Sequence, residues 1–432
     1  MVADVRLYVR PVSSRPHYAG CKHASGGTIR RCGYRYVITD SFCFSANTLY
    51  KPNRELKFIE ITSGCGGAGM HRASIAVRLT ARGLVETYRN LQLTRDVLSQ
   101  GPEMAATLRR GMALVSAVAM RDGFPSDIAS QVNTFTVLTG SPIKSWGPRS
   151  FTVCDERDAV LLDLGYGVPT ADCFELAGYA SEADIAEDLF HDRLRSGLSS
   201  LSANDAATLY RQIRESIIRN PVRTRAELLR FAQEFPEMSS DLPGFYRPLP
   251  ASALDGHLLR VCAFCRSPLF PTRERRAYPI GRCAVRECRL ANPGPKVGST
   301  HEVLVAGEWR LADAAIMTYW VGPGLPEINL YDALREKRKD VELYPMCDMA
   351  DIGIGGLDVG IELKSYSSAA VLGQRFAREI GGLRAFRRRI VAIPDFWIAI
   401  DRDYLRTVSN VSGAPDGIEF LPVSNVIREF AA

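Results

Sequence analysis

Three charged side chains near the C-terminal end of the chain have the chemistry of a metal-dependent phosphodiesterase. Residues 343–366 read LYPMCDMADIGIGGLDVGIELKSY, in which two β-like runs around a Gly-rich turn predict a hairpin. Side chains alternate along a strand, so Glu362 and Lys364 share a face, and the predicted register places Asp351 opposite Glu362. Two carboxylates can bind Mg²⁺ or Mn²⁺, and the ammonium can polarise or orient a water molecule that attacks a phosphodiester.

Two further aspartates lie close to this set. Asp348 stands just upstream and can replace or assist Asp351 if the chain bends there, so the choice between the two stays open. Asp358 falls in the predicted turn and is a weaker candidate. A strand that carries these charges by chance is the competing interpretation.

Four cysteines in the middle of the chain have the spacing of a structural zinc site. Cys262 and Cys265 form a CxxC pair, and Cys283 and Cys288 follow as a Cx4C pair. Four thiolates leave no open coordination position, so the predicted Zn²⁺ is structural, and buried free thiols are the competing interpretation. Four other residues of metal-binding type have irregular spacing, so we interpret them as separate side chains and not as a second zinc site: Cys21, His23, Cys32 and Cys43.

Arginines gather at two places where nucleic acid can bind. Between residues 260 and 289 the chain holds eight Arg and two Glu, a surplus that four thiolates and one zinc ion only partly offset. A second group follows the hairpin on a predicted helix. Contacts with DNA phosphates are predicted for Arg273, Arg275, Arg276, Arg375, Arg378, Arg387 and Arg388. A solvated surface, or favourable charge at a helix C-terminus, is the competing explanation.

The hairpin residues resemble the PD-(D/E)xK nuclease superfamily, which has the restriction-endonuclease-like fold. The residues Pro345, Asp348 and Asp351 look like its PD element, with the proline and the aspartates not adjacent. The run from Glu362 to Lys364 looks like its ExK element. The resemblance implies one more acid from a helix before the hairpin, and the candidates are Glu327 first, then Glu336 and Asp332.

A longer stretch, residues 215–432, is similar to the zinc-ribbon nuclease encoded with PIWI-type proteins in bacterial restriction and defence islands. The similarity rests on IIRNPVRTRAELLRF, FYRPLPASALDGHLLRVCAFCRSPLF, PGLPEINLYDAL and GIELKSY. It implies a DNA-directed endonuclease that works beside a PIWI-like protein and a helicase. The alternative is a catalytically inactive subunit that only binds DNA or serves as a scaffold in a defence complex.

Hydrophobic periodicity predicts a multidomain α/β protein around these residues. The predicted domains are an N-terminal α/β domain of unknown role at 1–172, a helical domain at 173–250, the zinc ribbon at 251–300 and a restriction-endonuclease-like α/β domain at 301–432. In the last domain the prediction is a helix at 326–339, the hairpin at 351–366, a helix at 368–388, strands at 390–393 and 397–400, and a short final helix.

Local signals refine this outline. Helical patterning runs from the GxGxxG stretch at 64–69 to about Met120, and that stretch is interpreted as a plain turn because no acidic strand end follows it. Residues 134–138 and 159–164 are strand-like, and Thr224 is the predicted N-cap of a helix. In the hairpin, Ile354 is predicted to pair with Val359.

The composition of the chain excludes several protein classes. Its 432 residues are 46% hydrophobic and 24% charged, which excludes disordered, collagenous and coiled-coil proteins. A net charge of +6 permits nucleic-acid binding without requiring it. The eleven cysteines, an odd number, favour metal ligands and free thiols over disulfides. Because no apolar run is long enough to cross a membrane, we expect a cytoplasmic protein, with room for an oligomer.

Overall fold

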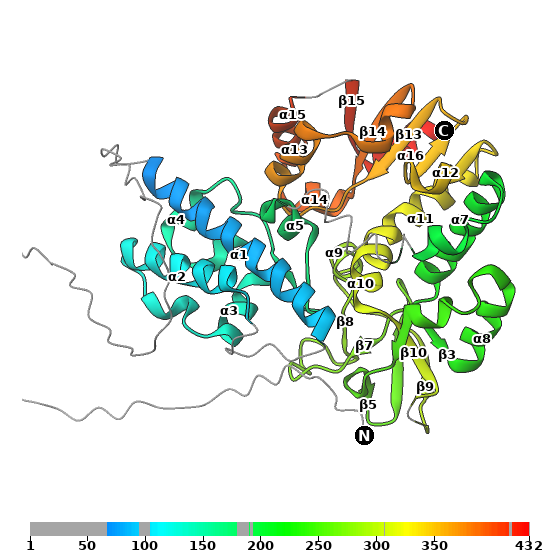
Figure 1. Cartoon of the computed structure of the whole chain (residues 1–432), viewed down its shortest axis with the longest axis horizontal. Coiled ribbons are helices and arrows are strands. Elements are labelled where there is room, and N and C mark those ends of the chain that lie inside the picture. The colour runs from blue at the N-terminus through cyan, green and yellow to red at the C-terminus, as the bar shows by residue number, and fades with distance from the viewer. Residues whose placement is uncertain are drawn as a thin grey trace, which may run out of the picture. The chain divides into compact units, whose positions relative to one another are not determined.

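The computed structural model describes residues 67–94, 104–178, 190, 193–305, 307–413 and 417–431. The contacts within the chain set residues 65–432 apart as one compact unit, whose helices and strands are mixed (Figure 1). The strand-like runs before residue 63 and the set Cys21, His23, Cys32 and Cys43 lie outside the described residues. The domain boundaries at 172, 250 and 300 stay predictions.

The first described part of this unit is mainly helical. Helix α1 pairs with α2 and also packs on α5, while a short strand pair, β1 with β2, leads into α5. The strand expected at 134–138 is wrong, because this segment lies in helix α3, whose buried residues Val132, Phe135 and Thr139 have helical spacing. The elements are α1 (Gly67–Thr94), α2 (Ala106–Arg121), α3 (Val132–Thr139), α4 (Arg149–Val153), β1 (Leu162–Asp163), β2 (Val168–Pro169) and α5 (Ala171–Ala177).

The middle of the unit combines helices with small sheets. Thr224 caps α8 in a capping box with Glu227, as the sequence predicts. The sheets have the strand orders β3-β10-β4, β5-β6-β9 and β7-β8. The elements are α7 (Ala203–Arg219), β3 (Val222–Thr224), α8 (Arg225–Glu234), β4 (Tyr246–Pro248), β5 (Leu254–Asp255), β6 (Leu258–Cys262), β7 (Leu269–Phe270), β8 (Arg282–Cys283), α9 (Arg286–Ala291), β9 (Val297–Glu302) and β10 (Trp309–Ala312).

A five-stranded mixed sheet forms the centre of the C-terminal part, in the order β11-β12-β13-β14-β15. The first three strands pair antiparallel, and β13, β14 and β15 pair parallel. Ile354 pairs with Val359, so the predicted hairpin register is confirmed. Helix α13 packs against α15, while α16 packs on β14 and β15 (Figure 1). The strands are β11 (Val341–Leu343), β12 (Ile352–Ile354), β13 (Val359–Leu363), β14 (Arg388–Ile393) and β15 (Ile418–Pro422), and the helices after the hairpin are α13 (Ala369–Arg378), α14 (Asp395–Ile400), α15 (Tyr404–Ser412) and α16 (Val423–Phe430).

Two boundaries predicted for this part are wrong. The helix expected at 368–388 ends at Arg378, since Glu379 is extended and Gly381 has a left-handed φ of 56° that a helix does not contain. The strand expected at 397–400 is helix α14, because Pro394 has no N–H to extend the β14 ladder and stands instead at the helix N-cap. The arginines beyond residue 386 therefore precede or lie on a strand.

The helix before the hairpin begins earlier than the sequence suggests. Helix α10 (Ala314–Ile316) continues through a π-helical turn (Met317–Val321) into α11 (Gly322–Arg335), so Pro323 and Pro326 lie inside a helical run. The N–H of Gly322 donates to the carbonyl of Met317, an i+5 bond that marks the wider turn. Helix α11 packs on β11 and β13, which brings its inner face to the hairpin. None of the described helices is both long and apolar enough to cross a membrane.

Candidate active site and cysteine cluster

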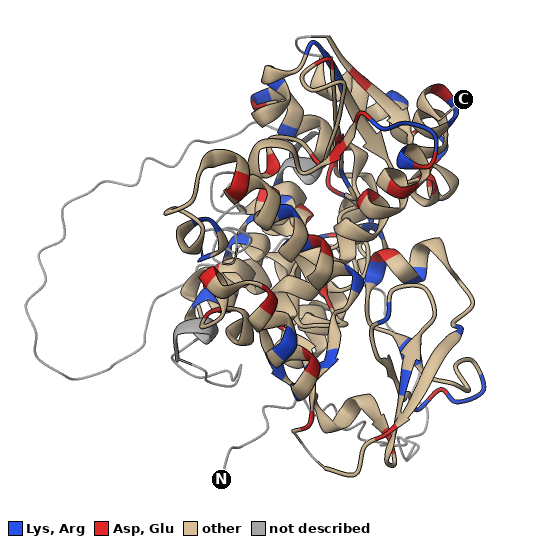
Figure 2. Cartoon of the chain, turned by 90° about the vertical axis from the view of Figure 1, so that its right-hand side faces the viewer, with Lys and Arg blue, Asp and Glu red and all other residues tan. Residues whose placement is uncertain are grey.

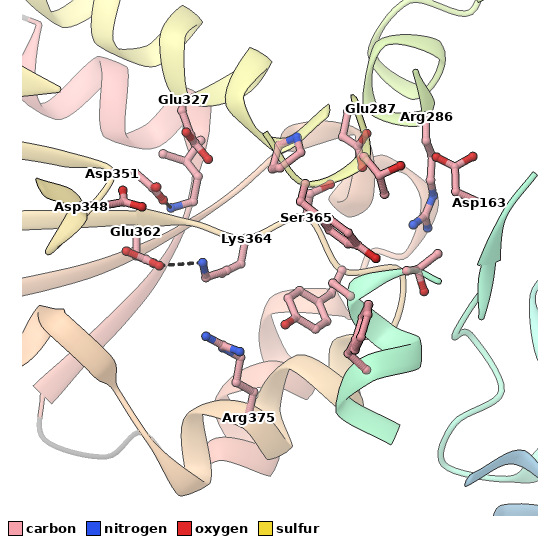
Figure 3. A pocket seen from close by; sticks show the side chains of 18 of the residues that line it. Asp163, Arg286, Glu287, Glu327, Asp348, Asp351, Glu362, Lys364, Ser365 and Arg375 are labelled. Atoms are coloured by element: carbon pink, nitrogen blue, oxygen red, sulfur yellow. Dashed lines mark hydrogen bonds and ion pairs between the residues drawn. The ribbon is translucent and has the colours of Figure 1, made fainter. Parts of the chain in front are cut away.

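The predicted catalytic side chains line one cavity of about 150 Å³. Figure 3 shows them grouped at one side of it, with the ion pair between Glu362 and Lys364 drawn as a dashed line. They come from three elements in the C-terminal part: helix α11, the segment before β12, and strand β13 with the residues that follow it. The set is Glu327, Asp348, Asp351, Glu362 and Lys364.

Asp351 and Glu362 lie across from each other at the end of the hairpin away from the turn. The Leu363 N–H donates to Oδ2 of Asp351 at 2.6 Å, which fixes this carboxylate next to β13. Asp351 is 5% exposed, and burial together with the Glu327 and Glu362 carboxylates raises its pKa well above the usual value, which Lys364 opposes. Nζ of Lys364 lies 2.6 Å from Oε1 of Glu362, and both side chains remain partly open to solvent.

Asp348 has a different environment, which separates it from Asp351. Its Oδ2 lies 2.5 Å from a guanidinium nitrogen of Arg214 and accepts from the Tyr210 hydroxyl at 3.3 Å. Asp348 has a left-handed φ of 80°, at the end of α12 (Pro345–Asp348), where Met346 and Cys347 are also left-handed. This bend directs Asp348 to helix α7, whereas Asp351 stays beside the strand. Asp351 thus lies beside Glu362, whereas Asp348 is paired with Arg214.

Glu327 is the buried acid of the cavity. Its side chain is 3% exposed, accepts from the Tyr344 hydroxyl at 2.6 Å and lies 3.5 Å from the Arg214 guanidinium. Burial raises the pKa of Glu327 to about 7, although Arg214 and Tyr344 act in the opposite direction. The other two candidates lie elsewhere: Asp332 pairs with Arg219 at 2.6 Å, and Glu336 is exposed after the end of α11.

Arg214 is the residue that reasoning from the sequence missed. Its side chain is 2% exposed, forms ion pairs with Asp348 and Glu327, and lies 3.9 Å from the Tyr344 ring centroid. A signal for it exists in the sequence, because it stands in the apolar stripe of α7 between Tyr210, Ile213 and Ile217. An arginine in a buried stripe requires acidic partners from another element.

The opposite wall of the cavity also carries charges that the sequence did not single out. Asp163, Arg286 and Glu287 lie there (Figure 3). Asp163 is the last residue of the short strand β1, and the other two open helix α9 of the cysteine-rich segment. Burial raises the pKa of Asp163, and the arginines Arg289, Arg286 and Arg282 oppose this shift. The cysteine-rich segment thus borders the candidate active site.

The four cysteines of the predicted zinc site are buried and close together. Their sulfur atoms all lie within 4.8 Å of one another, and the described residues contain no other such group of three or more ligand atoms. The sulfurs of Cys262 and Cys288 are 3.8 Å apart, and those of Cys265 and Cys283 are 3.3 Å apart. A tetrahedral Zn²⁺ with bonds of about 2.3 Å needs sulfurs about 3.8 Å apart, so the four thiols fit a closed zinc site.

Elemental analysis of the purified chain should therefore find about one zinc per molecule. We expect the Cys265→Ser variant to lose most of this zinc and part of its stability, since metal binding and local folding are coupled. Cys173→Ser is the matched control, because Cys173 is equally buried but lies in α5 outside the cluster. Zinc content that is unchanged in Cys265→Ser would contradict this ligand assignment.

The predicted phosphate-binding arginines are spread over several elements, and basic and acidic residues are interspersed (Figure 2). Arg375 and Arg378 both pair with buried Glu175 of α5, and Arg388 pairs with Glu419 and Glu429. Arg275 is exposed and pairs with Asp255 at 3.3 Å. The remaining predicted contacts are exposed: Arg273, Arg276 and Arg387. Three of the seven are thus held in multi-residue ion pairs that contribute to packing within the chain.

Comparison with known proteins gives one result for the C-terminal part. Residues 324–432 match the family model described as "REase associating with pPIWI_RE". This segment, which contains all five predicted catalytic residues, is a restriction-endonuclease-like domain linked to pPIWI defence systems. No curated protein and no solved structure matches the chain.

Proposed function

We propose that the C-terminal domain is a Mg²⁺-dependent endonuclease that hydrolyses DNA phosphodiester bonds in defence against foreign DNA. The proposal depends above all on one observation: the carboxylates of Asp351 and Glu362 and the ammonium of Lys364 line one cavity, at the end of a hairpin whose domain matches a restriction-endonuclease family. The family description names a pPIWI protein as partner, and the proposed setting includes a helicase as well.

The donor set of this cavity fits Mg²⁺ or Mn²⁺. Hard divalent ions prefer carboxylate oxygens, and Mg²⁺ commonly takes one or two of these and completes its shell with water. Asp351 and Glu362 supply two carboxylates. Burial and the neighbouring carboxylates of Glu327 and Glu362 raise the pKa of Asp351, and a bound cation would favour its ionised form. When bound, the ion would supply charge stabilisation for the phosphoryl oxygens and a more acidic water.

The other roles in the proposed reaction belong to groups of the protein itself. Lys364, which pairs with Glu362 at 2.6 Å, orients and polarises the attacking water once that carboxylate has a metal partner. The Leu363 N–H keeps the Asp351 carboxylate in place. Glu327 and Asp348 act as supporting acids, held by Tyr344 and Arg214 respectively.

The test is cleavage of single-stranded, bubble-containing and duplex DNA by the purified chain, alone and with its PIWI-type partner, in Mg²⁺ or Mn²⁺. We expect endonucleolytic products that require the divalent ion and disappear when EDTA is added. The zinc content of the EDTA-treated protein is measured as well, to show that the structural metal has not been removed. Isothermal titration should detect Mn²⁺ binding to the intact chain and its loss in Glu362→Gln. DNA binding without any metal-dependent cleavage would instead support the inactive scaffold subunit.

A further inference from the structure

A second, larger hollow adjoins the candidate active site. Its volume is about 950 Å³, and it shares the lining residues Asp163 and Arg286 with the catalytic cavity, so the two are neighbours. Three parts of the chain supply most of its lining: residues 140–165, the cysteine-rich segment from 262 to 295, and residues 397–404 from α14 to the start of α15. Ser367 lines it as well. Arg286 and Asp163 thus border both the hollow and the candidate active site.

Basic charge in the hollow comes mainly from the cysteine-rich segment. Lys144 and Arg157 also line it, but both pair with Asp158, at 2.8 Å and 3.5 Å. Arg282, Arg286 and Arg289 add three guanidiniums. The same lining holds Asp163, Asp401 and the two negative charges that four thiolates and one zinc ion carry together, so the basic groups are local and the hollow as a whole has no positive surplus. Arg289 donates to the carbonyls of Cys283 and Ala284, so it also holds the cysteine loop.

The other two guanidiniums lie over aromatic rings. Arg282 is 5.4 Å from the ring centroid of Tyr278, and Arg286 is 5.0 Å from that of Trp397. Exposed apolar side chains also gather in the hollow: Phe264 is 46% exposed, Leu164 51% and Ile400 60%. Arginines combined with exposed aromatic and apolar side chains are typical of sites that bind unpaired nucleotides, because guanidinium planes and rings stack on bases while the charge attracts phosphates.

We propose that this hollow binds a single strand of DNA and guides it to the catalytic cavity, an inference that rests on the proposed nuclease function. A hollow of this size accommodates a few unpaired nucleotides. It is too small for a double helix, whose major groove alone is about 12 Å wide. Arg282 and Arg286 contact phosphates, and Phe264 stacks on a base. Arg282 and Arg286 belong to the arginine cluster at 260–289, but they are not among the seven phosphate contacts that the sequence predicts.

The experiment is fluorescence anisotropy with a 12-nucleotide single strand and with the matching duplex, using the full chain in the Lys364→Ala background without added divalent ion. We expect the single strand to bind more tightly than the duplex. Arg282→Ala should weaken binding several-fold and lower the slope of log affinity against log salt by about 0.7, the value for one phosphate contact on a single strand. Phe264→Ala should weaken binding about tenfold and leave the slope unchanged, because stacking carries no counterion release.

Arg230→Ala and Phe124→Ala are the matched controls, since both residues are exposed but lie outside the hollow. We expect both to bind with the affinity of the parent chain. Parental affinity and salt slope in Arg282→Ala and Phe264→Ala would overturn the proposal, as would equal weakening of duplex and single-strand binding. Because no metal takes part, failure of metal-dependent cleavage leaves this result unaffected, and the two proposals fail separately.

Discussion

Lys364→Ala is expected to reduce DNA cleavage at least a hundredfold while DNA affinity stays within about twofold of that of the wild type. The ammonium acts on the attacking water and on charge that develops in the transition state, and removal of one such group commonly costs 10²–10⁴-fold in rate. Lys364 is one of several basic side chains that line the cavity, so its loss should have little effect on DNA binding. The measurement is a single-turnover cleavage rate in Mn²⁺ beside an anisotropy titration.

Two further variants make the Lys364 result specific. Lys339→Ala removes an exposed lysine that lies after α11, outside the cavity, and should cleave at the wild-type rate. Glu362→Ala should lose metal binding and cleavage together, because its carboxylate is a proposed ligand of the ion. Cleavage by Lys364→Ala at the wild-type rate, with Lys339→Ala unchanged, would refute the assigned role of Lys364.

Arg214→Met is expected to destabilise the chain by about 3–5 kcal/mol at pH 8, because it removes the cation from a buried ion-pair group and leaves its carboxylates uncompensated. The affected carboxylates are those of Glu327 and Asp348. Arg214 lowers the pKa of Glu327 against its burial, so the variant raises that pKa above its present value of about 7. The side chain of methionine retains much of the packing volume, which keeps the comparison electrostatic.

The loss should depend on pH in a predictable direction. In the unfolded chain Glu327 ionises near its ordinary pKa of 4.5, whereas the folded variant holds the proton to a higher pH than the wild type does. The folded variant therefore binds more protons than the unfolded chain between these values, and its stability falls as the pH rises. The destabilisation relative to wild type should be smaller at pH 5 than at pH 8.

Urea denaturation followed by circular dichroism at pH 5 and pH 8 measures this difference. Arg211→Met is the control, because Arg211 stands on the same helix but pairs with Glu342 near the surface at 3.2 Å. An exposed pair contributes about 0–1 kcal/mol, so the control should show a small change that is similar at both pH values. An equal loss at pH 5 and pH 8 in Arg214→Met would show that Arg214 does not control the ionisation of Glu327.

Local patterns in the sequence were sufficient for the hairpin and the cysteine cluster. Strand alternation around the Gly-rich turn determines that Ile354 pairs with Val359, and this register brings Asp351 and Glu362 together. The spacing of Cys262, Cys265, Cys283 and Cys288 likewise predicts that four thiols converge, and their sulfur atoms do lie close together. Both features depend on contacts between residues close in the sequence, which backbone geometry alone can specify.

Only the tertiary structure decided which charges belong to the site. Arg214 lies more than a hundred residues before Asp348, so its ion pairs arise from the packing of α7 on α12, which no local pattern encodes. Arg378 and Arg388 look free in the sequence, yet the fold brings Glu175 and Glu419 to them. Burial and long-range pairing determine whether a charge binds a ligand or stabilises the fold, and both are properties of the folded chain.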